Sequence, residues 1–80
     1  MKTNYFDLSP LARGVAHFVF KKGETTYESI KERFDEQRAR IGIDEIMSQK
    51  PSLLLFSAEN GTYKASKTLE FTLKALRHFA

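Results

Sequence analysis

The chain contains no cysteine, and this absence excludes several kinds of chemistry at once. Disulfide bonds, zinc sites with thiolate ligands and cysteine nucleophiles all need that residue. Small secreted domains are often held together by disulfides, so a reducing cytoplasm is the expected location. No apolar run approaches the roughly 20 residues that a membrane-spanning helix needs, and residues 1–7 have no apolar signal core. We therefore expect a cytoplasmic protein with no membrane partner.

Histidine is scarce and glycine-rich motifs are missing. The two histidines, His17 and His78, stand far apart, and neither has a carboxylate at a spacing that suggests a metal site. The adjacent acids at 35–36 and 44–45 are expected at exposed helix positions, where they would be solvated. The four glycines occur singly, so there is no phosphate-binding loop. We predict no catalytic residue, no cofactor and no metal, and hence a protein that is not an enzyme.

Size and composition favour one small folded domain. Eighty residues predict a single compact domain over 1–80, and the 41% apolar share with seven Phe and three Tyr is enough for a core. The net charge of +3 permits nucleic-acid binding without requiring it. One stretch is one-sided in charge: from Asn60 onward Glu70 is the only acid, against the bases Lys64, Lys67, Lys74 and Arg77.

The first helix is predicted to start at Ser9-Pro10, after an extended lead-in over residues 1–8. Serine is a good N-cap, and proline at the first helical position loses no needed N–H group. Leu11, Val15 and Phe18 follow at helical spacing. Gly23 is expected to end the helix. A strand over residues 15–20 is the alternative.

Thr25 and Glu28 match a capping box, and a second helix is predicted to run from there to Ile41. Glu36 and Arg40 form a favourable i,i+4 pair within it. Gly42 is expected as the residue that ends this helix. A short third helix is predicted from Asp44 to Gln49.

The pair Asn60-Gly61 predicts a β-hairpin at about residues 53–67. A two-residue type I′ turn needs φ > 0 at both central residues, which Asn and Gly accept. This turn would place opposite each other the pairs Ala58 and Tyr63, Phe56 and Ala65, and Leu54 and Lys67. One face of the hairpin is then mostly apolar. The alternative is a helix over 51–59 ended by Asn60-Gly61.

The last segment, residues 69–79, fits a helix or a strand, and its good helix formers favour the helix. The predicted fold is therefore α+β: a small single domain with two to three helices, a β-hairpin at about 53–67 and a C-terminal helix. A winged-helix-like arrangement and an all-α fold are the alternatives.

The element order resembles a winged helix-turn-helix domain. The stretch from Phe18 to Phe34, with an apolar helix that ends at a glycine and a capped helix after it, resembles the passage from the first to the second helix of that family. The resemblance implies a groove-binding helix at Asp44–Gln49 and a wing at Leu53–Lys67. Two features depart from the family: the capped helix is predicted to run unbroken through Asp35-Glu36-Gln37, and the implied groove helix is acidic, which phosphate disfavours.

Two functions are compatible with these observations. The first is a small non-enzymatic protein-interaction module, an adaptor or inhibitor that acts by occupying a surface of a partner protein. Such small proteins are often encoded by phages or other mobile elements. The alternative is a winged-helix-type transcriptional regulator that binds duplex DNA, and a homodimer is compatible with either. The candidate interaction surface consists of Arg38, Arg40, Lys50, Tyr63, Lys64 and Lys67.

The arrangement of the charges in space separates the two functions. DNA binding gains support if the basic candidates share one face without intervening acids. Protein binding gains support if apolar surface is exposed there instead.

Overall fold

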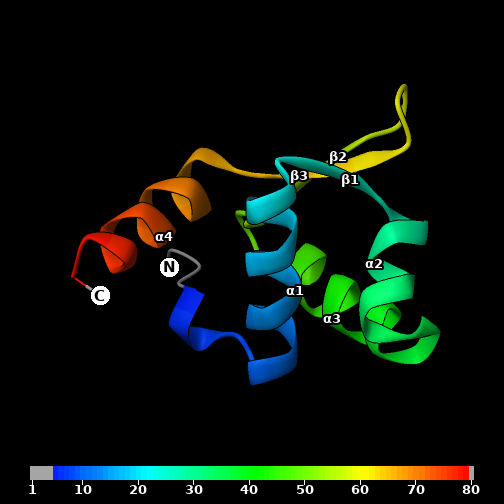
Figure 1. The fold of residues 1–80 in the computed structure, drawn as a ribbon, viewed down its shortest axis with the longest axis horizontal. Coiled ribbons are helices and arrows are strands. Elements are labelled where there is room, and N and C mark those ends of the chain that lie inside the picture. The colour runs from blue at the N-terminus through cyan, green and yellow to red at the C-terminus, as the bar shows by residue number, and fades with distance from the viewer. Residues whose placement is uncertain (1–4, 80) are drawn as a thin grey trace.

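The computed structural model describes residues 5–79, and the side chains up to residue 76. A 3-10 turn at Tyr5–Asp7 precedes helix α1 (Pro10–Lys22), so the part of the predicted extended lead-in that is described is not extended. After α1 come strand β1 (Glu24–Thr26), helices α2 (Tyr27–Phe34) and α3 (Glu36–Ser48), strands β2 (Leu54–Ser57) and β3 (Thr62–Ala65), and helix α4 (Lys67–Phe79) (Figure 1).

Helix α1 has the boundaries that its sequence predicts. The Ser9 hydroxyl accepts a hydrogen bond from the Ala12 N–H, and Pro10 takes the first helical position. Gly23 ends the helix at φ 84°, a left-handed conformation that glycine adopts without a steric penalty. The strand expected as an alternative over residues 15–20 is not formed.

The predicted capping box is displaced by one residue. Thr26, not Thr25, caps α2, and its hydroxyl accepts from the Ser29 N–H at 3.2 Å. Thr25 is buried in β1, where it lies opposite Tyr63 of β3. Strand β1 has no local signal in the sequence, because its three residues form a strand only by pairing with β3, almost 40 positions away.

The long second helix predicted to end at Ile41 is two helices. The chain breaks at Asp35, which has φ 75° and ψ 168° and caps α3 by accepting from the Arg38 N–H at 2.9 Å. The predictions that Gly42 ends a helix and that a separate helix spans Asp44–Gln49 are therefore wrong. Gly42 is buried inside α3, and residues 44–48 are the last turns of that helix.

The β-hairpin is present, but its turn differs from the predicted one. Ser57 lies opposite Thr62 and Leu54 opposite Ala65, so four residues form the loop and the register is shifted by two positions. The Gly61 N–H donates to the Ser57 carbonyl at 2.7 Å, and Gly61 has φ 66°. Asn60 does not take a positive φ, so the type I′ assignment is wrong. The shift is an even number, so the predicted apolar face is retained.

Helix α4 confirms the helical interpretation of the last segment, and Ser66 caps it by accepting from the Leu69 N–H at 3.2 Å. The fold is the predicted small α+β domain with one strand more than expected, and the all-α alternative is wrong.

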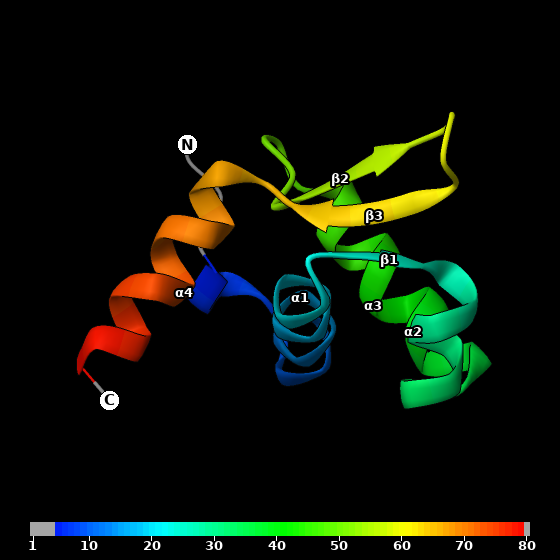
Figure 2. The same cartoon turned by 45° about the horizontal axis from the view of Figure 1, so that its top comes forward.

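The layers of the molecule place α1 at the centre. The strands are ordered β1-β3-β2, and the sheet lies across one end of the helical layer (Figure 2). With α2 and α3 between β1 and β2, and with the β2–β3 hairpin projecting beyond the helices, the element order agrees with the winged-helix-like alternative. The core is one cluster drawn from the four α-helices, from β2 and from the segments just before α1 and β2: Leu8, Ala12, Val15, Ala16, Val19, Ile30, Ala39, Ile43, Ile46, Leu53, Leu54, Leu69 and Leu73.

Candidate interaction surface

Helix α3 has one side in the core and the other in solvent. Ala39, Gly42, Ile43 and Ile46 are its buried residues. Arg40 and Asp44, one turn apart, lie on a different side and are exposed. The buried residues recur at intervals of three and four, so the opposite side of the helix is free to meet another molecule.

Each of the two arginines of α3 is paired with an acid. Arg38 lies 3.8 Å from Asp35, and Arg40 lies 4.0 Å from Glu36, and all four side chains are mostly exposed. The predicted Glu36–Arg40 pair is thus present. The electric fields of two opposite charges a few ångströms apart largely cancel at the distance of another molecule. Salt screens the field that remains.

Glu45 belongs to the fold and not to the exposed surface of α3. Its two carboxylate oxygens accept from the Ser9 N–H and the Ser9 hydroxyl, both at 2.7 Å. These hydrogen bonds, the backbone one first, hold the pKa of Glu45 below its usual range. The carboxylate connects α3 to the first turn of α1.

An aromatic pair lies on the face of the hairpin that is turned toward α3. The rings of Phe56 and Tyr63 are 4.8 Å apart, and Phe56 is 48% exposed. Burial raises the pKa of the Tyr63 hydroxyl, and the charge of Asp44 on α3 raises it further. Strand β2 of the hairpin contacts α3 directly, so the hairpin and α3 lie side by side and share one surface.

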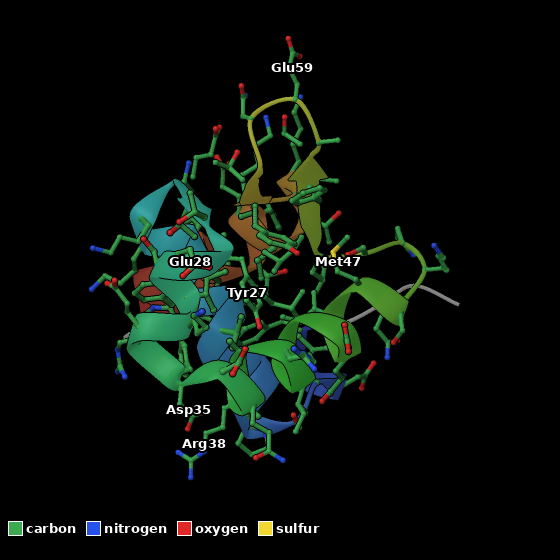
Figure 3. All side chains as sticks on the ribbon, turned by 90° about the vertical axis from the view of Figure 1, so that its right-hand side faces the viewer. Tyr27, Glu28, Asp35, Arg38, Met47 and Glu59 are labelled. Atoms are coloured by element: carbon green, nitrogen blue, oxygen red, sulfur yellow. The ribbon has the colours of Figure 1, made fainter. Side chains whose placement is uncertain are left out.

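Tyr27 and Met47 complete this surface (Figure 3). The Tyr27 hydroxyl donates to the Glu36 carbonyl at 3.5 Å, at the start of α3. The Met47 sulfur accepts from the Ser52 hydroxyl at 3.5 Å, near the start of β2. Both side chains are half-buried. We call this surface the α3–hairpin face, and its residues are Tyr27, Arg40, Asp44, Met47, Phe56 and Tyr63.

The six residues predicted for the interaction surface do not form one patch. Tyr63 and Arg40 lie on the α3–hairpin face. Arg38, two positions from Arg40, points to another side of α3. Lys64 follows Tyr63 in β3, so it lies on the opposite face of the sheet, where Glu24 and Leu55 are its neighbours across the strands. Lys50 is exposed after the end of α3, and Lys67 is the first residue of α4.

Lys64 does not have the edge-blocking role that a hairpin lysine often has. Strand β3 is the central strand of the sheet, so both of its edges are already paired. Four residues of the α3–hairpin face were not predicted: Tyr27, Asp44, Met47 and Phe56. Their apolar or acidic side chains carry no sequence signal for an interface, whereas the predicted surface consists mainly of basic residues.

Among residues 5–76, whose side chains the structure describes, there is no group of three metal-ligating side chains. His17 is exposed on α1, and the side chain of His78 is outside the described part. Within the same residues every buried side-chain nitrogen or oxygen has a hydrogen-bond partner. No helix of the described part is long and apolar enough to cross a membrane. Comparison with protein-family models, with curated proteins and with solved structures gives no match.

Proposed function

We propose that this protein is a non-enzymatic interaction module that binds a partner protein through the α3–hairpin face and acts by occupying the surface of that partner. The observation that carries the proposal is the half-exposed Phe56–Tyr63 pair on a surface whose charges are balanced. Burial of such an aromatic pair against a partner removes apolar area from water, which favours association.

The composition of the face supports a protein partner. Tyrosine, phenylalanine, methionine and arginine are enriched at protein–protein interfaces, and tyrosine and arginine are frequent among the residues that contribute most to affinity. Phe56 lies opposite Tyr63 across the hairpin, and this strand pairing holds the two rings side by side. The surrounding Arg40 and Asp44 provide both signs of charge for a polar rim.

The electrostatics argue against a nucleic-acid partner. Arg38 and Arg40 are each paired with an acid, and Glu59 stands at the tip of the projecting hairpin (Figure 3). A wing that contacts phosphate places its tip next to negative charge, so a glutamate there costs affinity. The basic candidates do not share one face, because Lys64 is on the far side of the sheet from Tyr63.

A winged-helix-type regulator that binds duplex DNA is the second candidate, and one observation favours it. The helix pair α2–α3, broken at Asp35 and followed by a projecting hairpin, has the arrangement in which a second helix enters the major groove. In that case Gln37 and Arg40, in the exposed first turns of α3, would contact base edges.

Paired substitutions on the two faces of β2 test the protein-binding proposal. Phe56 and its neighbour Leu55 are 48% and 47% exposed, on opposite faces of the strand. In capture from a host lysate followed by titration of the captured partner, Phe56→Ala should weaken binding roughly tenfold or more. Leu55→Ala should change it little. Equal binding by Phe56→Ala and the wild type, with the fold intact by circular dichroism, would mean that this face is not the interface.

Duplex DNA of mixed sequence, titrated at about 50 and 200 mM salt, tests the second candidate. If α3 enters the groove, log K falls by about 0.9 per phosphate contact for each unit of log salt, and Arg40→Ala weakens binding. We expect no submicromolar binding at physiological salt, because the face is charge-balanced. Tight, salt-sensitive binding that Arg40→Ala abolishes would make DNA the partner.

A further inference from the structure

Helix α4 presents an apolar side chain to solvent on the side that faces away from the core. Leu69 and Leu73 are buried, and they lie on the side of α4 that packs against the rest of the protein. Phe71, two positions from each of them, points the opposite way and is 76% exposed. Among the described residues it is the most exposed large apolar side chain. A phenylalanine so far out of the core is a natural anchor for another molecule.

The flanks of Phe71 differ from each other. On one flank Glu70 and Lys74, one helical turn apart, form an ion pair of 2.9 Å that is largely exposed. On the other flank the side chains are small and recur at helical spacing, namely Thr68, Thr72 and Ala75. Small residues allow a second helix to approach closely, and the charged flank decides which helices are attracted.

The charged flank is complementary to itself when two copies of α4 pack in antiparallel orientation. Antiparallel helices bring the same flank of each copy together, in reversed order. With the two-fold axis near Thr72, Glu70 of one copy lies opposite Lys74 of the other, and the same contact occurs a second time by symmetry. The two Phe71 side chains then lie near the centre of the contact, against the small residues of the other helix.

We propose that the occupant of this face is a second copy of the chain, and that the protein forms a two-fold homodimer through antiparallel α4 helices. Figures 1 and 2 show α4 on the far side of α1 from α2 and α3. Dimerisation therefore leaves the α3–hairpin face of each copy free. The dimer is a property separate from the function proposed for that face.

Charge reversal and mixing test the dimer. Glu70→Lys places lysine at both 70 and 74, and Lys74→Glu places glutamate at both positions. Each variant alone should sediment as a monomer at concentrations where the wild type is dimeric, because like charges face each other across the two-fold axis. The affinity between the two copies should fall roughly tenfold or more. An equimolar mixture of the two variants should form a heterodimer, because the opposed side chains are then of opposite sign.

The mixture separates the contact between copies from the ion pair within one helix. Within each variant the 70–74 pair has like charges, and mixing cannot change that. Association on mixing therefore reports the contact between the chains. Phe71→Ser should also give a monomer, whereas Leu55→Ser, on the outer face of the sheet, should not. Circular dichroism of each variant shows whether α4 remains folded.

Sedimentation equilibrium gives a clear outcome in either direction. A wild-type protein that remains monomeric at about 200 μM, where even a weak dimer is populated, overturns the proposal. So does a dimer that survives both Glu70→Lys and Phe71→Ser, because its interface lies elsewhere. The experiment needs no partner for the α3–hairpin face, so its failure and the failure of the proposed function are independent.

Discussion

At the scale of single residues, Asp35 shows how a side chain can replace the glycine that a turn calls for. Its φ of 75° and ψ of 168° lie in a region populated almost only by glycine, and holding another residue there costs on the order of 1–3 kcal/mol. The carboxylate recovers part of this cost by capping α3 through the Arg38 N–H. The break between α2 and α3 thus depends on a balance between backbone strain and capping.

The balance at Asp35 predicts opposite effects for two substitutions. Asp35→Gly removes the strain and remains an acceptable N-cap, so the free energy of unfolding should rise by about 1 kcal/mol. Asp35→Ala loses the cap and keeps the strain, so the free energy of unfolding should fall by about 1 kcal/mol. Urea denaturation of both variants measures the difference. A loss of stability in both variants would mean that the capping hydrogen bond of Asp35 outweighs the backbone strain at this residue.

The second residue-scale prediction concerns the pH dependence at Glu45. Its pKa is lowered in the folded protein by the two hydrogen bonds from Ser9, so protonation favours the unfolded state. The stabilisation is complete above the ordinary carboxyl pKa of about 4.3 and is lost as the pH falls through the lower folded value.

Glu45→Gln tests this linkage. The variant should be less stable than the wild type by about 1 kcal/mol at pH 7, a value discounted for partial exposure. The difference should shrink by pH 3, because the wild-type carboxylate is then being protonated. Glu59→Gln, at the exposed hairpin tip, is the control and should change stability little at either pH. A difference that does not depend on pH would contradict the role of the charge.

At the scale of elements, the contact between α1 and α3 requires glycine at one position. A Cβ atom on Gly42 would lie 2.7 Å from Val15 Cγ2, which is too close. Buried alanines at positions 12, 16 and 39 also keep the packed surfaces of these helices flat. The closeness of α1 and α3 holds α3 in place, so its outer side remains available for binding.

Gly42→Ala and Gly14→Ala form a matched pair that tests this contact. Gly42→Ala should lower the free energy of unfolding by about 1–3 kcal/mol, because the added methyl group forces the two helices apart. Gly14→Ala should raise it by up to about 1 kcal/mol, because its Cβ would meet Phe34 Cε1 at an ordinary 3.5 Å and alanine favours the helix. Equal changes in stability from the two substitutions would show that helix propensity, and not packing between α1 and α3, determines the effect of replacing glycine.

At the scale of the whole molecule, the two proposed surfaces lie on opposite sides of α1. The α3–hairpin face carries aromatic groups with balanced charge, and α4 carries Phe71 beside a self-complementary ion pair. A dimer through α4 would present two α3–hairpin faces, so a partner with repeated sites would be bound more tightly than a single site. Fold alone does not decide between a protein and a DNA partner, since one fold can support either function.

Much of the local structure could be predicted from the sequence. Ser9-Pro10 and Gly23 bound α1, good helix formers fill α4, and Asn60-Gly61 marks the loop of a hairpin. Each of these signals acts through hydrogen bonds or dihedral angles within a few residues, so distant parts of the chain have little influence on it.

Tertiary structure decided what local chemistry leaves open. Thr25 became part of a strand and left the cap to Thr26, because β3 pairs with β1 from almost 40 residues away. The sequence predicts that Gly42 ends a helix, but Gly42 lies inside α3. Glycine is needed there because α1 is so close that a side chain would not fit. The hairpin register and the exposure of Phe56 also depend on how β2 and β3 pack against α3 and α1. The sequence by itself determined where most elements lie, and contacts between distant residues determined which side chains meet on the surface.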